Sequence, residues 1–409
     1  MAILLTLAVL GRLPGATPTR VDRLIFPLNP KHNHASCIIE CPNGDLLVCW
    51  YRGSGERTAD DVAIMGSRLR KGSKAWSPEF VLADTPGFPD CSPCMVVDQK
   101  SNLRMFWPVI LNNRWESALL RYAVSSDYQR RAGAPRWTGG GVVLLKPGDE
   151  FTAKVESDMP RLWRPYAASA ALESGEKLEE YLAARTKAAS DKLSMRLGWM
   201  PRPHPVTLSD GRMLLPLYSD LFDFSLIAYS DDVGDTWSVS EPIVGPGNVQ
   251  PAIAVRRDGT LVAYMRDNGP PPQRVMVSES RDRGQTWTEP RDMELPDPGA
   301  GVDVVVLKSG RWVLVNNDTE NGRHSLALTI SEDEGRTWPR KVHLEHDHSV
   351  PEAGSYSYPS IIQARDRKIH VTYTYTPNAE DRAKLGGQGK SIKHVELTED
   401  WIMQASKPR

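Results

Sequence analysis

Six short polar turns, each followed by an apolar run, recur along the chain. They are PNGDLLVCW (42–50), KSNLRMFW (100–107), SDGRMLLPL (209–217), RDGTLVAY (257–264), KSGRWVLV (308–315) and RDRKIHVTY (365–373). Another short apolar run precedes the turns, as in ASCIIE, MVVD and SIIQA. Two apolar runs joined by such a turn are typical of a β-hairpin. The pattern therefore predicts six hairpins and an all-β fold.

A second motif, Ser-x-Asp-x-Gly-x-Thr-Trp, runs in phase with these turns. Three complete copies begin 50 and 51 residues apart, at Ser230–Trp237, Ser280–Trp287 and Ser331–Trp338, and two eroded copies are Ser67–Trp76 and Ser125–Trp137. The motif would join two further strands to each hairpin. Four strands in about 50 residues are the unit of a propeller blade. The sequence thus predicts a six-bladed β-propeller over residues 23–409.

The spacing between the second and third turns is longer than the others. The segment from about 138 to 197 contains SGEKLEEYLAARTKAASDKLSMRL, which is rich in helix formers with apolar residues at helical spacing. We expect a helical insertion there, between the second and third blades and over one face of the propeller. A seventh blade in this segment is the alternative.

The repeated motif has a local structural role in this interpretation. Its Ser and Asp side chains can bond to backbone N–H groups of their own turn, Gly allows a positive φ, and Trp can pack the turn against its blade. A catalytic group would not recur in several blades, because a site needs one constellation. We therefore predict no catalytic role for Asp333.

Composition limits the classes of partner. The chain has 409 residues with 50 basic and 51 acidic side chains, a net charge of −1. This balance argues against a broad nucleic-acid or anionic-membrane surface. The chain contains no run of 18 or more apolar residues, so no membrane span is expected. No pattern indicates a cofactor or a metal. Five cysteines are too few and too odd in number for a disulfide framework.

The N-terminal residues resemble a short leader. MAILLTLAVLGRLPGA combines a nine-residue apolar run with small residues, but it lacks a basic start. Residues 1–22 are therefore expected to be a signal peptide or leader. A secreted or periplasmic location is expected, with a cytoplasmic one as the alternative.

The residues just before the first strand of each unit should converge on the propeller axis. They are His34, Asp90 or Ser92, His204, Gln250, Asp303 and Tyr358. Histidine is a natural acid or base near neutral pH. His34 and His204 with Tyr358 would thus form an acid/base constellation, to which Arg52, Arg57 and Arg202 could add positive charge.

The repeats, their period and the turn–strand units resemble the sialidase (neuraminidase) superfamily of six-bladed propellers. The resemblance implies three arginines that bind a substrate carboxylate, a tyrosine nucleophile activated by a glutamate, and an aspartate as acid/base. Tyr358 in SYSYPSIIQARD matches the tyrosine, and Arg266 and Arg323 match the second and third arginines. Asp60 or Asp61 matches the aspartate, in a loop shorter than the family's.

Two positions depart from the family pattern. His34 stands where the resemblance places the first arginine, and Gln250 stands where it places the glutamate. A glutamine cannot take a proton at neutral pH, so Tyr358 would lack its usual base.

Three functions follow from this combination. The first is a sialidase-like glycoside hydrolase that acts on a terminal acidic sugar. The second is a uronate-specific lyase or glycosidase of the same fold that uses His34 and Tyr358, which the two departures favour. The third is a non-catalytic glycan-binding propeller. In each case the expected partner is an acidic carbohydrate.

Overall fold

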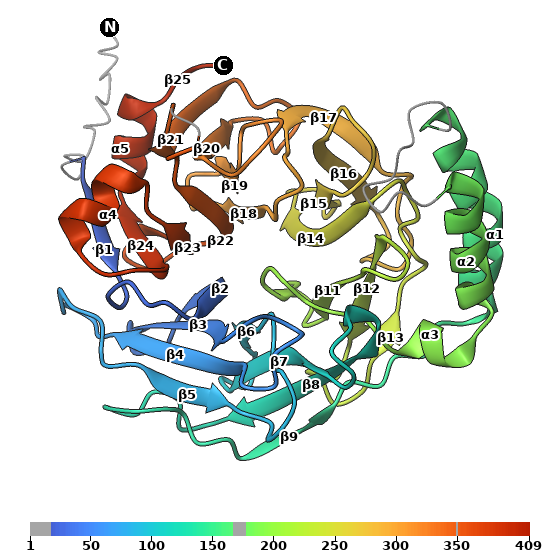
Figure 1. Cartoon of the computed structure of the whole chain (residues 1–409), viewed down its shortest axis with the longest axis horizontal. Coiled ribbons are helices and arrows are strands. Elements are labelled where there is room, and N and C mark those ends of the chain that lie inside the picture. Colours follow the sequence, from blue (N-terminus) through green and yellow to red (C-terminus); the bar gives the residue numbers. More distant parts are fainter. Residues whose placement is uncertain (1–17, 167–176, 349–350) are drawn as a thin grey trace, which may run out of the picture.

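Six antiparallel sheets, five with four strands and one with five, surround a central axis in the computed structural model (Figure 1). The structure describes residues 18–166, 177–348 and 351–409. Within these residues there are six sheets, and each is a blade. The predicted all-β, six-bladed propeller is confirmed, and the described part of the chain holds no seventh sheet.

The first three blades follow one another along the chain. Blade 1 contains β2 (His32–Glu40), β3 (Leu46–Gly53), β4 (Ala63–Leu69) and β5 (Phe80–Ala83). Blade 2 contains β6 (Cys94–Val97), β7 (Leu103–Ile110), β8 (Ala118–Ser125) and β9 (Gly139–Val142). Blade 3 contains β10 (Val206–Thr207), β11 (Met213–Ser219), β12 (Phe224–Ser230) and β13 (Ser238–Val239).

The last three blades complete the ring. Blade 4 contains β14 (Asn248–Val255), β15 (Leu261–Asp267), β16 (Arg274–Ser280) and β17 (Arg291–Pro296). Blade 5 contains β18 (Asp303–Val306), β19 (Trp312–Asn316), β20 (Ser325–Ser331) and β21 (Arg340–His346), with β25 (Lys407–Pro408) added at its outer edge. Blade 6 contains β22 (Ser355–Gln363), β23 (Ile369–Thr376) and β24 (Ser391–Leu397) from the C-terminal part of the chain. Two helices, α4 (Ala379–Leu385) and α5 (Glu399–Ala405), flank β24 in sequence.

The N-terminal strand closes the ring. β1 (Arg20–Leu24) pairs antiparallel with β24 and is the outermost strand of blade 6. The propeller therefore begins before residue 23, where the sequence placed its boundary. Residues 1–17, which hold most of the expected leader, lie outside the described residues.

The segment 138–197 differs from its expected form in two respects. Its first residues form β9, the outermost strand of blade 2. Its helices, α1 (Asp149–Trp163), α2 (Leu178–Ala189) and α3 (Lys192–Arg196), come after β9 and before β10. They lie at the outer edge of the ring beside β11–β13 and do not cover the central face (Figure 1). None of the described helices is long and apolar enough to cross a membrane.

The repeated motifs form the local turns that the sequence predicts. In the last copy the Ser331 hydroxyl donates to Asp333 at 2.7 Å and accepts from the Gly335 N–H at 2.9 Å. Asp333 also accepts from the N–H and the hydroxyl of Thr337, at 2.9 and 2.6 Å. Trp338 is buried. The other two complete copies repeat these bonds.

Antiparallel order fixes which face of the ring holds these turns. Each motif follows the third strand of a blade, which runs in the same direction as the first strand. The motifs therefore lie on the face where first strands end. The starts of the first strands lie on the opposite face, together with the ends of the second strands.

Irregular backbone aims side chains at that opposite face. The pairing of β2, β14 and β22 shifts at its start, between His34 and Cys37, Val249 and Ala252, and Ser357 and Ser360. Each bulge contains a residue with positive φ: Ala35 at 53°, Gln250 at 58° and Tyr358 at 54°. Such conformations carry strain and are concentrated at functional sites. The three bulges therefore indicate a functional site at this end of the axis.

Candidate active site

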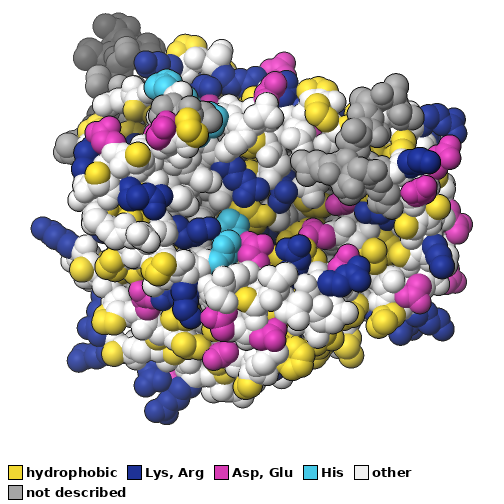
Figure 2. Space-filling model, viewed as in Figure 1, with side chains coloured by type: hydrophobic (Ala, Val, Ile, Leu, Met, Phe, Trp, Pro, Cys, Tyr) yellow, Lys and Arg dark blue, Asp and Glu magenta, His cyan; other side chains and the backbone are white. Residues whose placement is uncertain are grey.

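A polar pocket of about 260 Å³ lies at this end of the axis. Its lining comes from the starts of first strands, the ends of second strands and the loops beside them. The residues are His34, Tyr51, Glu56, Ser92, Trp115, Tyr218, Asp220, Gln250, Arg266, Asn268, Arg323 and Tyr358. Figure 2 shows histidine, basic and acidic side chains gathered at the centre of one face. The sequence predicted six of these residues (His34, Ser92, Gln250, Arg266, Arg323 and Tyr358).

Tyr358 lies between cations. Arg266, at the end of β15, donates from Nη1 to the phenolic oxygen at 2.9 Å, and Gln250 donates from Nε2 at 3.3 Å. The guanidinium of Arg323 lies 5.4 Å from the ring centroid. Two donors therefore face the phenolic oxygen, and neither of them can accept its proton. This geometry can stabilise negative charge on that oxygen.

His34 contacts the same tyrosine. Its ring centroid is 4.2 Å from that of Tyr358, and its Nδ1 is 3.0 Å from the Thr374 hydroxyl. Burial lowers the pKa of His34 well below its usual range, so the ring is neutral at pH 7. A neutral imidazole can act as a base, but it cannot replace the charge of an arginine.

The loop between β3 and β4 presents a different carboxylate from the one expected. Asp61 accepts from the Ser54 N–H at 2.8 Å and pairs with Lys31 at 3.2 Å, while Asp60 accepts from Asn113 at 2.9 Å. Both aspartates are exposed and neither lines the pocket. Glu56 lines it instead. The structure therefore does not place Asp60 or Asp61 in the pocket as expected, because Ser54, Lys31 and Asn113 bind their carboxylates outside it.

Glu56 is held as an anion. It accepts from the Tyr51 hydroxyl at 2.8 Å and lies 2.9 Å from His32 Nε2. Burial would raise its pKa, but the hydrogen bonds from His32 and Tyr51 help to outweigh burial and hold the pKa at about 2. Glu56 is thus ionised across the neutral range.

Tyr218 and Asp220 enter the pocket from blade 3, and sequence reasoning missed them. Tyr218 ends the apolar run of β11, and Asp220 begins the turn to β12. Burial and the charge of Asp223 raise the pKa of Asp220 to about 7, against the opposing effect of Arg266. Arg266 ends the second strand of blade 4 just as Tyr218 nears the end of the second strand of blade 3. For Tyr218, that shared position was the available signal.

Two further predicted arginines do not line the pocket. Arg52 packs over the ring of Phe26 at 4.5 Å, donates to Asn33 and pairs with Glu79. Arg57 stands at the rim, with its guanidinium 5.2 Å from the ring of Trp115. Arg52 therefore has a structural role, because its neighbours on the blade take up its charge.

His204 and Asp303 lie deeper in the ring than predicted. His204 Nδ1 is 3.1 Å from Asp303, and its Nε2 is 2.7 Å from the Ile38 carbonyl and 3.2 Å from the Ser360 hydroxyl. Ser360, which His204 contacts, lies two residues after Tyr358 along β22. The residues that the sequence assigned to this position in blades 3 and 5 were therefore two residues too far along the chain. The predicted places of these two side chains in the pocket are wrong, and they join blades instead.

The structure also places the two blade 2 candidates, Asp90 and Ser92, and Arg202. Asp90 accepts from Trp107 Nε1 at 2.6 Å and from the Thr85 hydroxyl at 3.0 Å, so its carboxylate fixes blade 2. Ser92, just before β6, lines the pocket. Arg202 is buried below Tyr358, 5.6 Å from the ring centroid, and donates to the Pro359 carbonyl at 2.9 Å.

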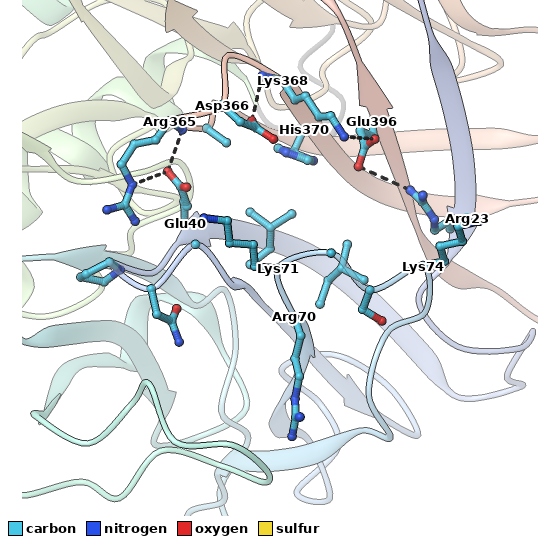
Figure 3. A pocket seen from close by; sticks show the side chains of 18 residues that line it. Arg23, Glu40, Arg70, Lys71, Lys74, Arg365, Asp366, Lys368, His370 and Glu396 are labelled. Atoms are coloured by element: carbon cyan, nitrogen blue, oxygen red, sulfur yellow. Dashed lines mark hydrogen bonds and ion pairs between the residues drawn. The ribbon is translucent and has the colours of Figure 1, made fainter.

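A larger pocket of about 450 Å³ lies between blades 6 and 1, on the face of the turns. Figure 3 shows it lined by basic and acidic side chains, some of which pair with one another. Arg365 pairs with Glu40 at 3.2 Å, and Lys368 pairs with Glu396 at 2.8 Å. It contains no tyrosine and lies away from the axis. The polar pocket at the axis is therefore the candidate active site.

Two proteins of the sialidase type are similar in sequence to part of this chain. A sialidase of Bacteroides fragilis (strain YCH46) is 26% identical over 180 residues, which are 41% of this chain and 32% of that protein. The anhydrosialidase of Macrobdella decora is 27% identical over 179 residues, 40% of this chain and 23% of that protein. The matched regions span a third or less of these relatives.

A solved structure shares the architecture. The NanB sialidase of Streptococcus pneumoniae superposes with a TM-score of 0.66 over 93% of this chain and 71% of that chain. Its identity is 12%, so this likeness shows the fold alone. With the sequence relatives, it confirms the resemblance to the sialidase-like propellers.

A family model decides membership. The model of the BNR repeat-like domain matches residues 136–371, which is more than half of the chain and includes all three complete motifs. The chain therefore belongs to the BNR repeat-like domain family.

Proposed function

We propose that this protein is a sialidase-like glycoside hydrolase that acts on a terminal sugar bearing a carboxylate. One observation carries the proposal: the phenolic oxygen of Tyr358 lies 2.9 Å from Arg266 Nη1, within a pocket that also holds Arg323. The pocket of about 260 Å³ is smaller than those that bind drug-sized ligands. It suits one terminal sugar unit. The sialidase relatives support the same class of substrate.

Arg266 and Arg323 would bind the carboxylate. The planar guanidinium fork can donate two parallel hydrogen bonds to a carboxylate. Arg323 is held by a bond of 2.8 Å from Nη2 to the Gly299 carbonyl, which orients it toward Tyr358. Because only these two arginines of the described residues line the pocket, a carboxylate would be bound with less positive charge than the three arginines of the family supply.

Tyr358 would be the nucleophile. Its oxygen forms a bond to the anomeric carbon while the bond from that carbon to the leaving oxygen breaks, and the electron pair of the broken bond stays with the leaving oxygen. Sialidases differ from most glycosidases in this use of a tyrosine. The phenolic proton passes to neutral His34, since Gln250 cannot accept it. Water then attacks the anomeric carbon, the bond from that carbon to Tyr358 breaks, and the phenolic oxygen takes its proton back from His34. The proton that the water loses balances the one that the leaving oxygen gains.

One feature favours a second candidate, β-elimination on a uronate-containing glycan. Gln250 faces Tyr358 at 3.3 Å in place of a carboxylate, and His34 packs against the same ring. In such a reaction Tyr358 or His34 removes the proton next to the carboxylate, and the C4–oxygen bond breaks to leave an unsaturated uronate. Arg266 would neutralise the substrate carboxylate in that reaction.

Products distinguish these functions. Purified protein is incubated with a fluorogenic sialoside and with a panel of uronate-containing glycans, and both released sugar and absorbance from unsaturated uronate are followed. We expect sialoside hydrolysis that is lost in Tyr358→Phe. Unsaturated product that requires His34 would instead establish the lyase. Binding without turnover of either class would refute both reactions and leave a glycan-binding propeller.

A further inference from the structure

The hairpin that carries Asp220 is held by the helices at the edge of the ring. The side chain of Phe222 packs on Phe151 of α1 at 5.3 Å between centroids and on Trp199 at 5.8 Å. Asp223 accepts from the hydroxyl of Tyr181 in α2 at 2.5 Å. The turn between β11 and β12 is thus fixed from its outer side, while Asp220 lines the pocket on its inner side.

Two carboxyl groups line the pocket among the described residues, and they differ in their bonding. Glu56 is bonded to Tyr51 and His32. No described residue forms a hydrogen bond or an ion pair with the Asp220 carboxyl, although the residue is only partly exposed. A carboxyl group that lines a pocket without a protein partner is free to bond to a substrate.

We propose that Asp220 is the proton donor to the leaving oxygen, and that the Tyr181–Asp223 contact positions it. This inference rests on the proposed hydrolase function. As the glycosidic bond breaks, the Asp220 proton moves to the leaving oxygen, and the aglycone departs as a neutral alcohol. In the second step the Asp220 carboxylate takes a proton from the attacking water, which restores the acid and yields the free sugar.

The protonation states of the two carboxyl groups support this assignment. Burial raises the pKa of Asp220 to about 7, whereas the contacts of Glu56 hold its pKa at about 2. Glu56 therefore carries no proton to donate near neutral pH. When two carboxyl groups of one site have their pKa values pushed apart, the group with the higher value is the acid. Asp220 is that group here.

Leaving-group dependence tests the assignment. A proton donor matters for an alkyl sialoside such as sialyllactose, and little for an aryl sialoside whose phenol leaves unaided. We expect Asp220→Asn to lose about 10²-fold or more of kcat/KM on sialyllactose and much less on the aryl sialoside. Tyr181→Phe should show the same selective loss to a smaller degree. For the wild type, kcat/KM on sialyllactose should fall as pH rises through about 7, and this limb should be absent in Asp220→Asn.

Activity on the aryl sialoside is also the control for folding of each variant. Equal losses on both substrates in Asp220→Asn would overturn the inference, and so would a selective loss in the matched variant Glu56→Gln. A wild type that hydrolyses sialyllactose while Asp220→Asn keeps full activity would overturn this inference alone. A wild type that hydrolyses neither sialoside would refute the proposed function, and the inference with it.

Discussion

The phenolic oxygen of Tyr358 and Nη1 of Arg266 lie 2.9 Å apart, although 92 residues separate them in the chain. The bulge in β22 gives Tyr358 its positive φ of 54°, and Arg266 is the last residue but one of β15, in the next but one blade. Two separate blades must therefore be in register for this contact to exist. The contact joins the proposed nucleophile to the proposed carboxylate ligand.

Replacement of either pocket arginine by lysine should weaken substrate binding. Arg266→Lys and Arg323→Lys keep the charge but lose the planar fork. A hydrogen bond to a charged group contributes about 1.5–3 kcal/mol, so KM for a sialoside should rise by about 10- to 100-fold. Steady-state kinetics measure this. Arg52→Lys is the matched control, because Arg52 lies outside the pocket, and its KM should be unchanged. Equal effects in all three variants would contradict the assignment.

A carboxylate at position 250 should raise the rate of sialoside hydrolysis. Gln250 Nε2 is 3.3 Å from the Tyr358 oxygen, so the Gln250→Glu carboxylate could accept the phenolic proton. General base catalysis typically contributes 10²–10⁴-fold, and with His34 already present we expect a gain in kcat of about tenfold. Gln250→Ala supplies no base and should not show the gain. An unchanged or lower kcat in Gln250→Glu would mean that removal of the phenolic proton by His34 does not limit the rate.

Loss of a motif aspartate should affect stability and leave catalysis intact. Asp333 accepts from Thr337 and Arg336 backbone N–H groups and from two hydroxyls. Asp333→Ala should lower the free energy of unfolding by about 1–2 kcal/mol, measured by denaturant titration, while kcat/KM stays constant. Glu332→Ala, which removes only a surface pair with Arg311, should cost less. A loss of kcat/KM in folded Asp333→Ala would give this turn a catalytic role.

The His204–Asp303 pair should make stability depend on pH. Burial lowers the pKa of His204, but the neighbouring Cys37 and Asp303 outweigh burial and raise the pKa well above its usual 6.5. A raised folded pKa contributes stability that is fully present below about pH 6.5 and lost as pH rises through the folded value.

Thermal unfolding of the wild type and His204→Gln across pH 5–9 checks this expectation. The difference in free energy between the two proteins should be largest at low pH and should shrink as pH rises above about 6.5. A difference that grows with pH would mean that His204 is neutral in the folded protein.

The sequence predicted the ring because the ring is encoded locally. Each motif such as Ser331–Trp338 closes its own turn through bonds within eight residues, so the blade count can be read from repeats. Tyr358 and Gln250 followed from the same register, and Arg266 and Arg323 from the resemblance to the sialidase superfamily. The strand β1 escaped notice because its partner, β24, is remote in the chain and no motif marks it.

Side chains in loops were less predictable. Asp60, Asp61 and Glu56 share one loop, and only its folded path decides that Glu56 enters the pocket. His204 and Asp303 were misplaced because no repeated motif marks where the first strands of blades 3 and 5 begin. Asp220 depends on a hairpin that distant helix residues hold in place, such as Tyr181, and no local pattern could place it.

The most direct measurement of the central claim is the site of covalent labelling by a sialoside inactivator. A fluorinated sialosyl fluoride slows hydrolysis of the glycosyl–enzyme bond, and peptide mapping by mass spectrometry locates the attached sugar. The account predicts one adduct, on Tyr358, that is absent in Tyr358→Phe together with sialoside hydrolysis. Hydrolysis by the wild type with an adduct on another residue, or with undiminished activity in folded Tyr358→Phe, would contradict it.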